Sequence, residues 1–209
     1  YGPFSGAEYL KTVTFEEGME RIPNLILTKA TKVTKIIIPS TVREIGGSAF
    51  SGCTSLVDIV LPDNIEIIEG SVFSNCTKLS EVKWPAGLKK IGGDAFEYTD
   101  LRELQLPGNL ESVGSWAFEC CKNLESVKFT YNNKVGFKLE IGYAAFKGCT
   151  SLWKVSLSEN VKELPSELFS GCSSLEILEI PESVTKLGYY MIQGTAIQSI
   201  VIPKQTAQV

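Results

Sequence analysis

Apolar residues recur along this chain in one short arrangement: an aliphatic residue, two others, a second aliphatic residue, one other and a large apolar residue. The arrangement occurs nine times, first over residues 10–15 and last over residues 197–202. Because its last two apolar positions are separated by one residue, each copy predicts a short strand with one buried face. Every copy returns at the same point of a longer unit, so we expect the nine strands to lie parallel in one sheet.

The longer unit recurs at a nearly constant step, which predicts a repeat solenoid. A half-repeat, 1–16, and a tail, 204–209, flank repeats of 22, 23 or 28 residues at 17–39, 40–62, 63–85, 86–107, 108–130, 131–158, 159–181 and 182–203. Units of this size cannot bury their own apolar faces and must stack on their neighbours. We therefore expect residues 1–209 to form a single elongated domain.

A second column pairs a small or aliphatic residue with phenylalanine. The six pairs are Ala49-Phe50, Val72-Phe73, Ala95-Phe96, Ala117-Phe118, Ala145-Phe146 and Leu168-Phe169. Equivalent positions of successive coils lie side by side in a solenoid, so the six rings should stack along the core. Glycine recurs shortly before this column, which indicates short turns, 3-10 or helical segments on the convex side.

A further column is small and weakly polar. Cysteine occupies it in five repeats and Ala or Thr in the others: Cys53, Cys76, Cys121, Cys149 and Cys172, with Ala30, Thr99 and Thr195. We expect free thiols that point into the core. Disulfides between neighbouring coils stay open, because strands ~4.8 Å apart place Cα atoms within disulfide range. Cysteines one repeat apart do not form a zinc motif.

Charge and composition narrow the possible functions. The formal net charge is −4 with scattered Lys and Arg, which argues against nucleic-acid binding. Histidine is absent, which removes the commonest general base and metal ligand, so we expect no cofactor, no metal and no catalytic residues. No apolar run reaches the ~20 residues that span a bilayer, so no membrane insertion is expected. The segment YGPFSGAEYL lacks the features of a signal peptide.

Repeat 131–158 has 28 residues where most have 23. Its extra residues follow a strand and begin with Tyr131, Asn132, Asn133 and Lys134. Two asparagines close to a glycine predict a turn, so we expect a loop or short hairpin that projects from the edge of the solenoid. Insertions in repeat proteins often lie on the binding side, and an insertion without a function is the alternative.

The pattern L-x-x-I-x-L-P-x-x-[VIL]-x-x-I-G-x-x-A-F-x-x-C runs through residues 10–203, for example over 79–96. It resembles the BspA-like class of leucine-rich repeats, known from bacterial cell-surface antigens and adhesins. The resemblance implies a leucine-rich-repeat right-handed superhelix with a concave parallel β-sheet. It also implies secretion or surface display, hence an extracellular or cell-surface location, and binding rather than catalysis. Only Pro203 and the tail KQTAQV follow the last predicted strand, so no cap is expected at that edge.

Two columns flank the buried middle residue of each strand and should face outward, and a third lies at the edge of the sheet. They contain the candidate residues for binding a protein or a cell-surface or extracellular-matrix component: Asp58, Val60, Glu81, Lys83, Arg102, Glu103, Gln105, Glu125, Lys128, Trp153, Lys154, Ile177 and Glu179. The oligomeric state is left open.

Asp58, Glu81 and Glu103 should form an acidic ladder with ~5 Å between neighbours. This spacing is similar to that of the carboxylates in retaining glycosidases, which gives a glycan-active or glycan-binding protein as an alternative. Calcium held between the carboxylates is another alternative, because this ion prefers oxygen ligands. An open sheet does not exclude water, so a solvated charged face is favoured.

Exposed apolar residues should accompany these charges: Ile37, Val57 and Val60 toward one end, and Trp153 with Ile177 toward the other. Tryptophan and arginine are enriched in interface hot spots, so Trp153 is interpreted either as such an anchor or as a cover for the rim of the core. The leading hypothesis is an adhesin-like, non-catalytic recognition module. A rigid spacer of roughly 40 Å is the remaining alternative.

Overall fold

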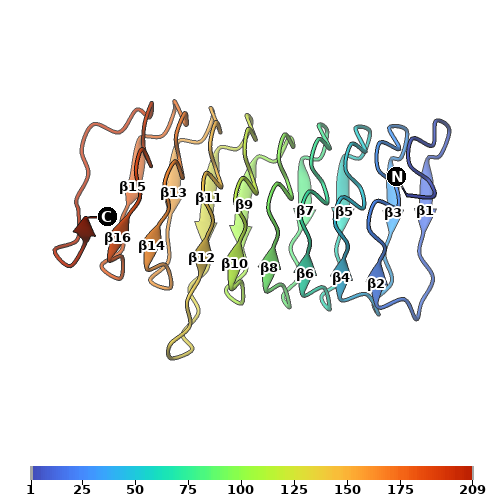
Figure 1. The fold of residues 1–209 in the computed structure, drawn as a ribbon, viewed down its shortest axis with the longest axis horizontal. Helices are drawn as coiled ribbons and strands as arrows, with labels where there is room; N and C mark the ends of the chain where they lie inside the picture. The colour runs from blue at the N-terminus through green and yellow to red at the C-terminus, as the bar shows by residue number, and fades with distance from the viewer. Residues whose placement is uncertain (1, 209) are drawn as a thin grey trace.

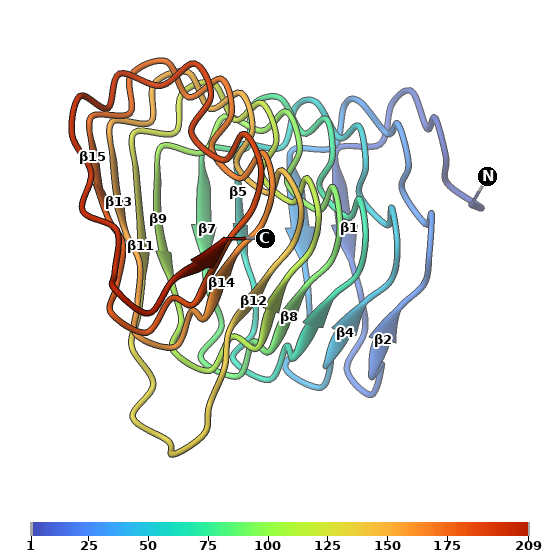
Figure 2. The ribbon, with the colours of Figure 1, turned by 60° about the vertical axis from the view of Figure 1, so that its left-hand side comes forward.

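The computed structural model describes residues 2–208. The chain winds as stacked coils along one axis, with its two termini at opposite ends (Figure 1). Each complete coil carries two short strands, and these pair in parallel with their equivalents in adjacent coils. The fold is therefore the predicted repeat solenoid, and Figure 2 shows its two ladders of strands on different sides of the coils.

The first ladder is called the main sheet, and it contains the strands expected from the apolar pattern. Their bounds are β1 (Thr12–Thr14), β3 (Lys35–Ile37), β5 (Asp58–Val60), β7 (Glu81–Lys83), β9 (Glu103–Leu106), β11 (Ser126–Phe129), β13 (Lys154–Ser156) and β15 (Ile177–Glu179). The expected alternation holds, since the middle residue of β5, Ile59, is buried between two exposed neighbours.

The prediction of nine strands in one sheet was wrong in two respects. Within the described chain, residues 197–202 form no strand. Hydrogen bonding also divides the other eight strands into three groups, β1–β3, β5–β7 and β9–β11–β13–β15. The missing strand belongs to repeat 182–203, one of the two repeats with 22 residues.

The second ladder was not predicted as strands. Its members are β2 (Arg21–Ile22), β4 (Glu44–Ile45), β6 (Ile67–Ile68), β8 (Lys90–Ile91), β10 (Ser112–Val113), β12 (Glu140–Ile141), β14 (Glu163–Leu164), β16 (Lys186–Leu187) and β17 (Ala207–Gln208). It is continuous from β2 to β12, past both breaks in the main sheet. β17 lies in the tail 204–209, where no element was expected, and pairs with β16.

The predicted column of six phenylalanines is confirmed. All six rings are fully buried, and neighbouring ring centroids from Phe50 to Phe169 lie 5.0–5.8 Å apart. Their backbones are also linked, because the N–H of each phenylalanine donates to a carbonyl of the next coil, as from Phe73 to Ala95 at 2.7 Å. The core is thus continuous from coil to coil.

Of the short turns, 3-10 or helical segments expected beside this column, the structure has turns. No helix of either kind occurs between residues 2 and 208. In the turns around each phenylalanine of the column, two residues have a positive φ, for example Ser71 (57°) and Asn75 (60°), which produces consecutive tight turns. Because Phe73 lies between them and bonds to the next coil, the backbone here serves the stacking of coils instead of a helix.

The cysteine column points into the core as free thiols, as predicted. Cys53, Cys76, Cys121, Cys149 and Cys172 are fully buried, and the sixth cysteine, Cys120, is half-buried. Each buried thiol donates to a carbonyl of the preceding coil, as from Cys76 Sγ to Phe50 O at 3.2 Å and from Cys172 Sγ to Phe146 O at 3.1 Å. The thiols therefore also link the coils.

The insertion in repeat 131–158 projects from the edge of the coils, as expected (Figures 1 and 2). Its base is held by Asn160, which is 5% exposed. The side chain of Asn160 accepts a bond from Asn132 N–H at 2.7 Å and donates to Asn132 O at 2.9 Å. Asn132 is therefore an anchor, whereas Asn133 and Lys134 lie exposed beyond it.

Candidate binding surface on the main sheet

The outward columns of the main sheet gather most of the candidate residues. Register aligns Asp58 with Glu81 and Val60 with Lys83 across β5 and β7. The strands β9, β11, β13 and β15 form a separate paired group beyond β7, and their register gives two further rows of outward residues. The first row contains Glu103, Ser126, Lys154 and Ile177. The second row contains Gln105, Lys128, Ser156 and Glu179. The candidates therefore form two patches rather than one continuous surface.

The main sheet is interrupted between β7 and β9. Among the described residues, no Cα atom of β7 lies within 8 Å of a Cα atom of β9. The wider spacing is visible in Figure 1. An open depression of about 820 Å³ occupies this place, lined by Ser80, Glu81, Val82, Lys83, Arg102, Glu103 and Glu125. Five of these seven residues were predicted for binding, and Ser80 and Val82 were missed.

The turn before β9 is one residue shorter than the turn before β7. Cys76 and Leu79 are three positions apart, but the equivalent Thr99 and Leu101 are only two apart. Asp100 N–H donates to Leu79 O at 3.0 Å, so the two coils still touch just before the strands. The repeat is one residue shorter here, and the strands separate beyond this bond.

Trp84 lies in the core next to the same break. Its ring makes edge contacts with Phe96 and Phe118, with centroid distances of 5.1 and 6.3 Å. The equivalent position holds a smaller aliphatic residue in the neighbouring coils, Leu61 and Leu106. Trp84 and Val82 are half-buried rather than buried, so the core is partly open to solvent through the break.

The prediction of an evenly spaced acidic ladder was therefore only partly correct. Asp58 and Glu81 are in register on paired strands, but the break separates Glu81 from Glu103. No ion pair in the described part of the chain involves any of the three carboxylates. Residues 2–208 also contain no group of three or more Cys, Asp or Glu side chains suited to a metal ion.

A second, narrower opening separates β3 and β5. Their strands are not hydrogen-bonded, and a depression of about 270 Å³ lies between them. Its lining includes Ile37, Asp58 and Val60, of which Ile37 and Val60 are 42% and 63% exposed. The expected apolar group near the N-terminal end therefore lies along an opening in the sheet.

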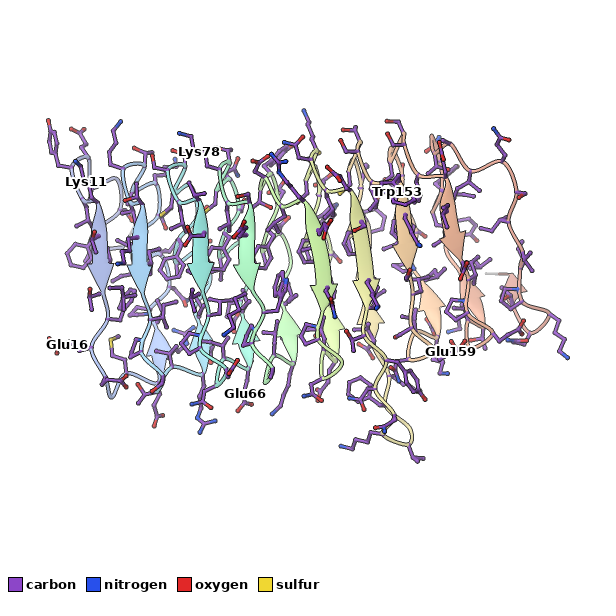
Figure 3. The ribbon with its side chains drawn as sticks, turned by 180° about the vertical axis from the view of Figure 1, so that it is seen from behind. Lys11, Glu16, Glu66, Lys78, Trp153 and Glu159 are labelled. Carbon is purple, nitrogen blue, oxygen red and sulfur yellow. The ribbon has the colours of Figure 1, made fainter. Side chains whose placement is uncertain are left out.

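Trp153 lies at the edge where the strands begin (Figure 3). It is 44% exposed, and Ile177 on the next coil is 38% exposed. The ammonium group of Lys154 lies 5.9 Å from the centre of the Trp153 ring, within the range of a cation–π contact. More than two fifths of Trp153 is therefore accessible to a partner, and the rest of the side chain is covered.

The insertion adjoins the opposite edge of the main sheet. A depression of about 510 Å³ is lined by Gln105 and Lys128 of the sheet together with Tyr131 and Glu159. Tyr131 is 59% exposed, and Glu159 is labelled at this edge in Figure 3. The candidate residues Gln105 and Lys128 thus lie next to the first residue of the insertion.

The carboxyl groups with raised pKa values lie elsewhere. Partial burial is the main cause that raises the pKa of Asp94, Glu97 and Glu119, all on the turns around the phenylalanine column. Their mutual repulsion adds to the effect, as of Asp94 on Glu97. These groups belong to the turns and not to the main sheet.

The chain matches the family model for the BspA type leucine-rich repeat region, in six copies over residues 2–101, 28–136 and 89–209. No curated protein matches the sequence. A solved leucine-rich repeat protein from Bacteroides ovatus is 31% identical with a TM-score of 0.83, over 94% of this chain and 52% of that one. This chain therefore spans about half the length of that relative.

Two other solved structures have the same fold. A leucine-rich repeat protein from T. pallidum is 28% identical with a TM-score of 0.60, over 85% of this chain and 72% of that one. A leucine-rich cell surface protein from Faecalibacterium prausnitzii is 24% identical with a TM-score of 0.56, over 96% of this chain and 55% of that one. Together with the family match, these similarities show that the chain belongs to the BspA-type leucine-rich repeat family.

Proposed function

We propose that this chain is a non-catalytic recognition module of a secreted or surface-displayed bacterial protein. It binds a protein, or another cell-surface or extracellular-matrix component, through the main sheet. The observation that carries the proposal is the depression between β7 and β9, where charged residues from adjacent coils surround a half-buried apolar residue, Val82. Charged groups around apolar contact area are the general composition of protein interfaces.

Two further features support this surface. Arg102 lines the depression and Trp153 lies exposed at the same edge, and both residue types are enriched among interface hot spots. One solved protein of the same fold is described as a cell surface protein, which agrees with surface display. In the described chain, no helix has the length and hydrophobicity to cross a bilayer.

Capture from cell-surface and extracellular-matrix extracts by the immobilised chain tests the proposal. The double variant Arg102→Glu, Trp153→Ala is expected to capture its partner at least tenfold less well than wild type. Lys90→Glu, an exposed change on the second ladder, is the matched control and should capture normally. If the double variant captures the same partner with unchanged affinity, the main sheet is not the binding surface.

The alternatives make different predictions. A rigid spacer would tolerate any polar substitution in the outward columns, so the double variant would behave like wild type. A glycan-active enzyme would lose turnover on Glu81→Gln. The separation of Glu81 from Glu103 removes the continuous ladder of carboxylates from which the glycan hypothesis arose. We therefore favour binding of a protein partner.

A further inference from the structure

The break between β7 and β9 leaves backbone groups without partners across the gap. In β1 and β3, Phe15 N–H donates to Ile37 O at 3.0 Å and Thr34 N–H to Lys11 O at 2.9 Å. The equivalent bonds, from Trp84 to Gln105 and from Arg102 to Ser80, are absent from the described residues. Two facing strand edges therefore offer free donors and acceptors within one sheet.

The gap is wider than the distance between paired strands. Neighbouring strands lie ~4.8 Å apart, so two strands with one between them are ~9.6 Å apart. The Cα atoms of β7 and β9 are separated by more than 8 Å, whereas paired strands such as β5 and β7 approach more closely. A separation of ~9.6 Å admits one extended segment.

The opening is limited in length. It is closed before the strands by the bond from Asp100 N–H to Leu79 O at 3.0 Å. It is closed after them by the bond from the Asn109 side-chain amide to Ala86 O at 3.0 Å. The occupant is thus a short extended stretch about as long as Ser80–Trp84, not a long added strand.

We propose that this gap is a slot for an extended polypeptide segment of the partner, which inserts between β7 and β9 and pairs with both strands. The proposal rests on the proposed function and names its partner chemistry. Added strands gain affinity from main-chain hydrogen bonds and specificity from alternate side chains. Here the segment would satisfy two edges at once and cover the half-buried Val82 and Trp84.

The flanking side chains define the residues that fit. An outward residue of an inserted parallel segment would lie between Glu81 and Glu103, which favours lysine or arginine. The next residue would face the core between Val82 and Leu104, which favours valine or isoleucine. The outward residue after it would lie next to Lys83, which favours glutamate or aspartate. The slot therefore selects a basic–aliphatic–acidic sequence.

The test uses the peptide acetyl-Ser-Lys-Val-Glu-Val-Ser-amide, titrated into isotopically labelled protein and followed by amide NMR signals. We expect saturable shifts at Val82, Glu103 and Gln105. The matched control is the same peptide N-methylated at the first valine and the glutamate, which keeps every side chain but loses a backbone donor toward each edge. It should bind at least tenfold more weakly. Equal binding of the two peptides, or no shift at millimolar concentration, would overturn the proposal.

A protein variant tests the origin of the slot. Thr99→Cys with one threonine inserted between positions 99 and 100 restores the spacing found from Cys76 to Leu79. If it folds, shown by circular dichroism, it should close the ladder and bind the peptide at least tenfold more weakly, and undiminished binding would contradict the proposal. If it does not fold, the comparison of the two peptides decides. Failure of the slot is distinguishable from failure of the proposed function, because Arg102→Glu, Trp153→Ala would then still lower partner capture.

Discussion

The rings of Phe118 and Phe146 lie face to face, with centroids 5.1 Å apart and planes within 4° of parallel. They are 28 residues apart in sequence, and the insertion lies between them. The distance is close to the ~4.8 Å spacing of paired strands, so the rings follow the rise of the coils. The extra residues therefore leave the stacking of the core unchanged.

Removal of a central ring should destabilise the whole stack. Phe96 is fully buried and contacts Phe73, Trp84 and Phe118, with centroids 5.0, 5.1 and 5.4 Å away. Phe96→Ala should lower the free energy of unfolding by about 3–5 kcal/mol, measured by denaturant titration. Phe4→Ala, at a ring that is 53% exposed, is the control. Equal denaturation midpoints for Phe96→Ala and wild type would show that this ring does not stabilise the fold.

Two adjacent glycines should differ sharply in their tolerance of alanine. A Cβ atom on Gly46 would lie 2.7 Å from Ile22 O and 2.9 Å from Asn24 N, both backbone atoms of the preceding coil. A Cβ atom on Gly47 would meet nothing closer than Gly70 O at 3.5 Å. Gly46→Ala should therefore cost more than about 1 kcal/mol by thermal unfolding, whereas Gly47→Ala should be close to neutral. A similar loss of stability for both variants would contradict the close approach of Gly46 to the preceding coil.

The buried thiols should be inert in the folded protein. Burial raises the pKa of Cys53 to about 12 and also raises the pKa of Cys76, so these two thiols hold little thiolate at pH 8, and burial shields the other thiols of the column from the reagent. With a chromogenic disulfide reagent at pH 8, we expect only the half-buried Cys120 to react quickly. Denaturation without a reductant should release six reactive thiols. Fewer than six would indicate a disulfide, and Cys120→Ser should remove the fast phase.

Glu97 should make stability depend on pH. Burial is the main cause of its raised pKa; repulsion from Asp94 and Glu119 adds to it, and the hydrogen bond from Ser74 opposes it. The folded state then keeps a proton that the unfolded chain has released, so stability falls as the pH rises from the usual glutamate range through the raised pKa. Glu97→Gln should therefore raise Tm at pH 7 more than at pH 4. Equal shifts at both values would contradict this, and the exposed Glu8→Gln serves as control.

The repeat, the buried columns and the outward face could be predicted from the sequence, because the same residue pattern recurs in successive repeats. Phe50 and Phe73 occupy the same position of identical-length repeats, and the contact between them follows from that alone. The second ladder was missed because strands such as Arg21–Ile22 have two residues, too few to show an alternating pattern. The sequence did not decide between turns and short helical segments on the convex side, because the intercoil hydrogen bonds that hold the turns have no counterpart in the local sequence.

The break in the main sheet could be anticipated only in part. Thr99 in the cysteine column and the 22-residue length of its repeat were visible in the sequence, and the other repeat with both features, which contains Thr195, lacks its strand altogether. From a shortened turn alone, one cannot predict whether the strand that follows it shifts its register, separates from the neighbouring strand or fails to form. In the structure β9 moves away from β7, next to the Trp84 ring that packs against Phe96 and Phe118, and such contacts across coils are not visible in the sequence.

Native-state hydrogen exchange of single backbone amides tests the central claim, that the main sheet is open between β7 and β9. The amides of Glu103 and Gln105 face the gap, whereas those of Ser126 and Lys128 occupy the same positions of β11 and face the paired strand β9. We predict at least 100-fold stronger protection for Ser126 and Lys128. Equal protection at all four amides would show that the sheet is closed and that the slot does not exist.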